Sequence, residues 1–109
     1  GRGCPAAARN ALERALLTPA GAASPVLWRL LLGLELRHGP AGAARRAFLR
    51  GVHAVPWSKA LWMDGLGSLP PAEMPAAERA EMVGLMRDKG IRLRTDVYEI
   101  LLRDVQGLA

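Results

Sequence analysis

The chain has a single cysteine, Cys4, and only two histidines among its 109 residues. One cysteine cannot form an internal disulfide, which is compatible with a reducing compartment. A zinc site built from His and Cys alone is also excluded, because carboxylates from scattered positions would have to complete it. We therefore expect no metal and no cofactor.

Catalytic patterns are equally scarce. No carboxylate pair or Ser/His/Asp set stands at a spacing that implies convergence, and Cys4 has no neighbouring group that would activate its thiol. Gly65 and Gly67 form no phosphate loop, because no strand precedes them and no Gly-Lys-Ser/Thr follows. His38 and His53 lie at predicted helix ends, where a cation near the C-terminus is simply favourable. The sequence predicts that this protein is not an enzyme.

Long apolar runs are absent. The longest, from Leu30 to Leu36, is interrupted by Gly33 and Glu35 and is too short to span a bilayer. No secretory leader is evident, since the chain opens on Gly-Arg-Gly-Cys and passes directly into an alanine-rich helix. The chain also lacks an initiator Met, so we expect it to be a fragment of a longer protein. Because the apolar run is short, we expect no contact with a membrane.

Positive charge is abundant but uneven. The formal net charge is +5, with eight Arg against two Glu in residues 1–55 and seven Lys or Arg against eight Asp or Glu in residues 56–109. A basic first half predicts contact with nucleic acid or with an acidic protein surface. The alternative interpretation is an Arg-rich face that is merely solvated.

Proline and glycine separate a series of predicted helices. We expect a turn over residues 18–24, a left-handed cap at Gly39, and the fourth helix to stop early near Leu66. On the fifth helix, Met82, Leu85 and Met86 should point inward. The expected helices cover residues 5–17, 25–38, 41–54, 57–66, 75–89 and a final segment from Thr95.

Two sequence patterns occur twice. The helix that starts Ala8-Arg9 and reaches Leu16 reappears 36 residues later, and Leu27-Trp28 returns 34 residues later as Leu61-Trp62. Self-similarity at this period is typical of a helical solenoid, which offers binding surfaces. We expect an all-α helical-repeat fragment. Its parts would be repeats over residues 1–66, a linker over 67–74, and a pair of C-terminal capping helices over 75–109.

The tryptophans and arginines are the candidate site residues. Trp28 and Trp62 recur at the repeat period inside Leu-rich helices, so core packing is favoured over base stacking. Phe48 is also expected in the core. Trp57 begins a helix and could anchor an interface. Arg46 and Arg50, with Arg45 and His53 beside them, form a basic stripe that could contact phosphate. Arg45 and Arg50 could instead pair with acidic groups of neighbouring repeats, because both recur as Arg9 and Arg14.

The order of these motifs resembles the half-a-tetratricopeptide (HAT) repeat. The residues that carry the resemblance are Pro25-Val26-Leu27-Trp28 through Glu35, Ala44-Arg45 through Arg50, and Pro56 through Trp62. The resemblance implies repeats that are pairs of antiparallel helices, in scaffolds of nuclear RNA processing, splicing and polyadenylation.

The second half of the chain resembles a more specific family. The run from Pro56 to Asp64 and the run from Leu85 to Arg94 are similar to the C-terminal end of the nuclear-RNAi-defective-two (NRDE-two) family. That resemblance implies a nuclear scaffold for protein partners in RNA silencing, RNA surveillance or splicing, with an exosome-associated RNA helicase among the partners. The alternatives are a basic RNA-binding surface on the same fold and a tetratricopeptide-like module that docks peptides.

Overall fold

The structure, a computed structural model, describes residues 4–88, and every regular element in that range is helical. This part of the chain is therefore all-α, as the sequence predicts. The last predicted helix, from Thr95, and the predicted end of the fifth helix at residue 89 lie outside the described residues. Within residues 4–88 the helices are α1 (Pro5–Leu16), α2 (Pro19–Ala22), α3 (Pro25–His38), α4 (Ala43–Ala54), α5 (Lys59–Ser68) and α6 (Ala76–Asp88).

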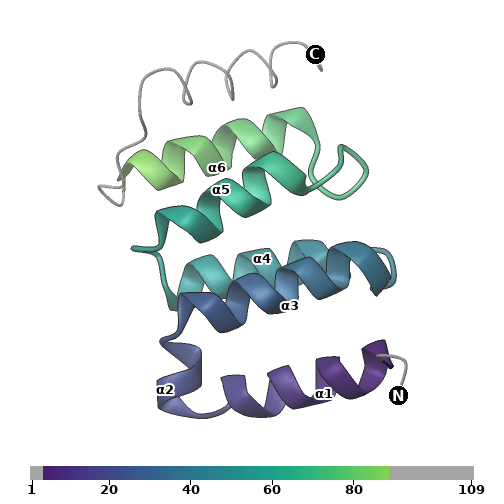
Figure 1. The fold of residues 1–109 in the computed structure, drawn as a ribbon. Coiled ribbons are helices and arrows are strands. Elements are labelled where there is room, and N and C mark those ends of the chain that lie inside the picture. The colour runs from purple at the N-terminus through teal and green to yellow at the C-terminus, as the bar shows by residue number, and fades with distance from the viewer. Residues whose placement is uncertain (1–3, 89–109) are drawn as a thin grey trace.

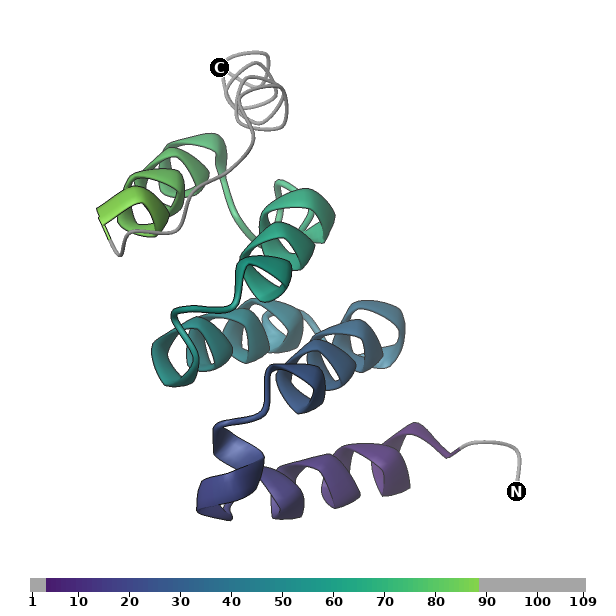
Figure 2. The ribbon, with the colours of Figure 1, turned by 60° about the vertical axis from the view of Figure 1, so that its left-hand side comes forward.

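The helices form a stack with α1 at one end and α6 near the other (Figure 1, Figure 2). Helix α3 packs most extensively on α4, and it also contacts α1 and α5. Helix α5 in turn contacts both α4 and α6. Each helix therefore buries its apolar side mainly against helices close to it in the sequence, and short connections suffice.

The local structure around Trp28 recurs around Trp62. Ser24 Oγ accepts a hydrogen bond from Leu27 N at 3.4 Å, and Ser58 Oγ accepts one from Leu61 N at 3.3 Å. Both serines thus cap the first turn of a helix, which satisfies an amide that the helix leaves unpaired. Each indole Nε1 then donates at 2.9 Å to the carbonyl six residues earlier, Ala22 O for Trp28 and Pro56 O for Trp62.

One core cluster runs through the stack. The Trp62 ring meets the Phe48 ring edge to face, with ring centroids 6.0 Å apart. Two glycines allow this close packing: a Cβ at Gly65 would lie 2.1 Å from Phe48 Cδ1, and one at Gly51 would lie 2.8 Å from Leu61 Cδ2. Backbone and ring therefore approach more closely than alanine would permit. The largest fully buried side chains are Trp62, Phe48, Leu31, Leu32, Leu61, Leu66, Met74, Met86, Val55 and Val83.

Two predictions of local backbone structure need correction. Residues 18–24 are not only a turn: Thr18 Oγ1 accepts from Gly21 N at 2.9 Å and starts the short helix α2. Gly39 is extended at φ −78° and ψ 157°, because a residue before proline avoids helical angles. The left-handed glycine is Gly42, at φ 86°.

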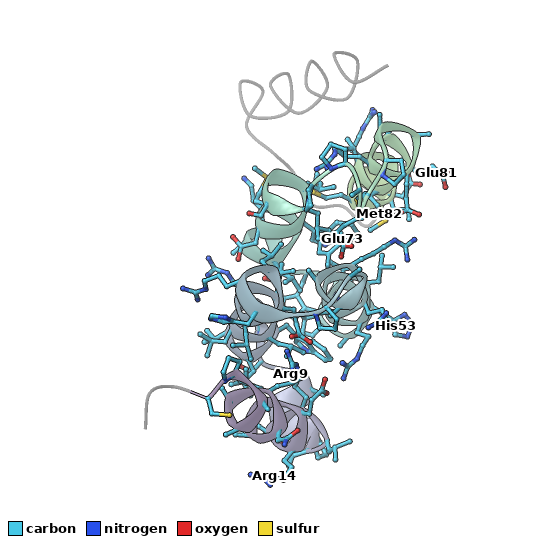
Figure 3. The ribbon with its side chains drawn as sticks, turned by 90° about the vertical axis from the view of Figure 1, so that its right-hand side faces the viewer. Arg9, Arg14, His53, Glu73, Glu81 and Met82 are labelled. Carbon is cyan, nitrogen blue, oxygen red and sulfur yellow. The ribbon has the colours of Figure 1, made fainter. Side chains whose placement is uncertain are left out.

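Helix ends and faces also differ from the sequence expectation. Helix α5 continues past Gly65 to Ser68, so the non-helical connection begins at Leu69. On α6, Leu85 is 47% exposed, which makes its predicted inward position wrong. The buried stripe consists of Arg79, Met82, Val83 and Met86, which share one helical face, and Leu85 falls off that face. Figure 3 shows Met82 turned toward the stack and Glu81 turned away from it.

Arg79 is buried in the core, which the sequence does not predict. Its side chain is 3% exposed and donates to three backbone carbonyls: Leu66 O, Leu69 O at 2.6 Å and Met74 O at 3.4 Å. These carbonyls lie at the end of α5 and in the connection to α6, where a cation is favourable near the negative end of the helix. Arg79 Nε has no partner. The guanidinium thus closes the end of α5 from inside.

Candidate partner-binding surfaces

The α4–α5 turn exposes a large aromatic side chain. Trp57 is 62% exposed, while Val55 and Ser58 on either side of it are buried. The turn is held by Ser58 N, which donates to Val55 O at 3.0 Å, and by the Ser58 cap on α5. A hydrogen-bonded turn that presents an exposed indole is the kind of feature that anchors protein interfaces.

The basic stripe of α4 is largely engaged by acidic groups. Arg45 Nε donates to Glu78 Oε1 at 3.0 Å and Arg45 Nη2 to Glu78 Oε2 at 2.5 Å, which joins α4 to α6. Arg50 makes a similar two-pronged pair with Glu13 of α1, at 2.8 and 2.7 Å. The Arg50 guanidinium carbon also lies 5.2 Å from the centre of the Trp28 ring, a cation–π distance.

These pairs shift the acid–base properties of both partners. The hydrogen bonds from Arg50 lower the pKa of Glu13, and those from Arg45 lower the pKa of Glu78. The same hydrogen bonds, donated to the carboxylates, raise the pKa of Arg45 and of Arg50. All four groups are charged at neutral pH, and each arginine faces a compensating carboxylate.

Arg46 and His53 of α4 make no ion pair among the described residues. Both are exposed, and His53 points away from the stack in Figure 3. The structure therefore separates the predicted basic stripe into two paired arginines that bridge helices and two outward side chains, those of Arg46 and His53. This arrangement leaves less positive charge for phosphate than the sequence alone implies.

The three residues predicted for the core lie in it. Trp28 is 5% exposed, Trp62 1% and Phe48 0%. Because both indole N–H groups are already bonded to carbonyls and both rings are covered, neither tryptophan offers a face for a stacked base.

Two ion pairs between helices could not be predicted from the sequence. Arg9 Nη2 of α1 pairs with Glu35 of α3 at 2.7 Å. Arg29 Nε donates to Asp64 Oδ2 at 2.7 Å and links α3 to α5. These partners are 26 and 35 residues apart, so only the acidic and basic composition of neighbouring helices could have suggested them.

A small cavity of about 170 Å³ lies between the end of α3, the start of α4 and the connection before α6. Its two carboxylates are both occupied: Glu35 accepts from Arg9, and Glu73 accepts from Gly42 N at 2.9 and 3.1 Å. Glu73 thereby caps the N-terminus of α4, where a carboxylate is favourable. The two carboxylates that line the cavity therefore link parts of the fold to one another: Glu35 links α3 to α1, and Glu73 links the connection before α6 to α4.

Among residues 4–88, no group of three or more His, Cys, Asp or Glu side chains is placed to hold a metal ion. No helix in that range has the length and apolarity needed to cross a membrane.

Comparison with known proteins gives two related sequences. Over 94 residues, 84% of this chain, it is 29% identical to human "Nuclear exosome regulator NRDE2". Over 98 residues, 88% of this chain, it is 29% identical to the mouse protein of the same name. The chain spans only 8% of the length of each of these relatives. No protein-family model matches, and no solved structure matches.

Proposed function

We propose that this chain is a protein-interaction segment of a nuclear RNA-processing factor related to nuclear exosome regulator NRDE2. The similarity to the human and mouse proteins of that name, over most of this chain, supports the relationship and the nuclear location. The relatives are named as regulators of the nuclear exosome, and this segment would serve a larger protein with that kind of role.

We further propose that the helices are HAT-type repeats that form a scaffold. The recurrence of the capping serine and of the bonded tryptophan, 34 residues apart, supports a repeated unit. The observation that carries the scaffold proposal is Trp57, a 62% exposed indole on a turn fixed by a buried serine. Its partner would be a protein of the nuclear RNA-processing machinery, and the exosome-associated RNA helicase is the first one to test.

The experiment is affinity purification of the full-length protein from nuclear extract, with quantification of the captured proteins. Three forms are compared with wild type: deletion of residues 1–109, Trp57→Ala, and the control Leu17→Ala. Leu17 is 85% exposed but lies at the other end of the stack, after α1. We expect the deletion and Trp57→Ala to lose the same partner, by about tenfold or more for the anchor variant. Partners unchanged by the deletion would leave the segment only a structural role.

The second candidate function is direct RNA binding by α4. The exposed Arg46 guanidinium, with the exposed His53 side chain on the same helix, favours it, whereas the ion pairs of Arg45 and Arg50 support a protein scaffold. RNA binding should fall steeply with salt and be lost in Arg46→Glu. Arg14→Glu is the matched control, since Arg14 is an exposed arginine on α1. A salt-dependent affinity that depends on Arg46 and not on Arg14 would favour RNA over the scaffold.

A further inference from the structure

The same residue types are buried on α4 and exposed on α1. Ala44 and Ala47 of α4 are 4% and 2% exposed, whereas Ala8 and Ala11, 36 residues earlier on α1, are both exposed. The two helices otherwise correspond, because α1 packs on α3 as α4 packs on α5. The difference is α3, which covers α4 and places Trp28 against Gly51. No helix among residues 4–88 covers α1 in that way.

Helix α3 also carries unexplained apolar exposure. Val26 and Leu30, one turn apart on the same face, are 60% and 54% exposed. Their counterparts 34 residues later on α5 are Ala60 and Asp64, and Asp64 accepts a hydrogen bond from Arg29 of α3. The side of α5 that bears Asp64 therefore faces a neighbouring helix. The corresponding side of α3 bears Val26 and Leu30, which no described helix covers.

Arg14 of α1 also differs from its counterpart on α4. Its counterpart Arg50 lies over the Trp28 ring and pairs with Glu13. Arg14 makes no ion pair among the described residues, is exposed, and points away from the stack in Figure 3. An exposed apolar face bordered by an arginine without a described ion pair has the composition of an interface more than of a solvated surface.

We propose that Ala8, Ala11, Arg14, Val26 and Leu30, here called the α1–α3 face, bind one apolar, tryptophan-bearing helix from outside these 109 residues. The occupant would lie on α1 and α3 as α3 lies on α4 and α5. Its tryptophan would lie beneath Arg14, as Trp28 lies beneath Arg50. Where α3 presents Arg29 to Asp64, the occupant would present an apolar side chain, because Leu30 stands in place of the acid.

The probe is a fluorescein-labelled peptide with the sequence of residues 24–39, which supplies the helix that covers α4. The peptide carries Arg29→Leu, which supplies the apolar side chain that would meet Leu30 of the protein. Val26→Gln and Leu30→Gln in the peptide improve its solubility and leave the residues that face α4 unchanged. Binding to the 109-residue protein is followed by fluorescence anisotropy. We expect saturable binding that weakens about tenfold or more when the peptide carries Trp28→Ala, or when the protein carries Ala11→Glu. Ala77→Glu, an exposed alanine of α6, is the control and should bind as wild type.

Circular dichroism verifies that Ala11→Glu folds, as expected for a substitution at an exposed position. The proposal is overturned if the peptide does not bind, or if Ala11→Glu and Ala77→Glu bind it equally well. Sedimentation of the unliganded protein tests the other occupant. A dimer that Ala11→Glu converts to a monomer would mean that a second copy fills the face, which also overturns the proposal. Trp57 lies outside this face, so the result is independent of the partner-capture experiment.

Discussion

At the scale of single residues, two glycines of α5 have opposite roles. Gly65 lies against the Phe48 ring, whereas a Cβ at Gly67 would meet no atom within 4 Å. Gly65→Ala should therefore overpack the core and lower the free energy of unfolding by about 1–3 kcal/mol. Gly67→Ala should raise it by up to about 1 kcal/mol, because alanine favours the helix. Urea unfolding of both variants measures the contrast, and equal effects would contradict the packing around Phe48.

Arg79 gives a second prediction at this scale. Replacement by Met keeps the volume but leaves the carbonyls of Leu66, Leu69 and Met74 without their donor. The loss of hydrogen bonds from a charged group should cost about 1.5–3 kcal/mol of unfolding free energy. Arg46→Met, at an exposed position, should stay within about 0.5 kcal/mol of wild type. If Arg79→Met proves as stable as Arg46→Met, the guanidinium does not hold the end of α5.

How far the sequence predicts single residues depends on how local their environment is. Ser24 and Pro25 announce a helix start by themselves, and α3 begins there. Gly39 does not identify the left-handed residue, because Pro40 forces it to be extended and the positive φ moves to Gly42. Arg79 has no local signal at all: its partners are carbonyls that only the folded connection brings together.

At the scale of elements, the ion pairs between helices make stability depend on pH. The pKa of Glu78 and that of Glu13 are lowered in the folded protein by Arg45 and Arg50. A lowered folded-state pKa stabilises the protein above the unfolded pKa of about 4.3, and this stabilisation is lost as pH falls through the folded value. Half-exposed pairs of this kind contribute about 0.2–1 kcal/mol each.

Glu78→Gln should therefore reduce stability at pH 7 and flatten its decline below about pH 4.3. Thermal unfolding across pH 3–7 measures both effects. Glu81→Gln, an exposed glutamate on the same helix, is the control. A decline as steep in Glu78→Gln as in wild type would show that the Arg45 pair does not contribute.

Helix existence was predictable from proline, glycine and apolar spacing, since these act within one element. The contacts between elements were not. Arg9 and Glu13 suit a pair within α1, but each binds another helix instead, because α3 and α4 bring Glu35 and Arg50 closer to them. The pairing of charges is decided by which helices pack together, and the sequence does not state that directly.

At the scale of the whole molecule, the three tryptophans separate folding from recognition. Trp62→Ala removes a buried ring from the centre of the stack and should cost about 3–5 kcal/mol of unfolding free energy. Trp57→Ala should leave stability within about 0.5 kcal/mol, because the indole is largely in solvent. Chemical unfolding of both variants tests this. A large destabilisation by Trp57→Ala would mean that the residue supports the fold and is not free to serve as an anchor.

The hydrogen bond from each buried indole to the carbonyl six residues earlier also determines where the chain can accept inserted residues. An inserted residue between Pro56 and Trp62, or between Ala22 and Trp28, would draw the carbonyl away from the ring. Outside those segments the length can vary, and it already does. The first pattern repeats after 36 residues and the second after 34, a difference taken up where α2 occupies the connection before α3. Related proteins should therefore differ in length within that connection and keep the two six-residue spans unchanged.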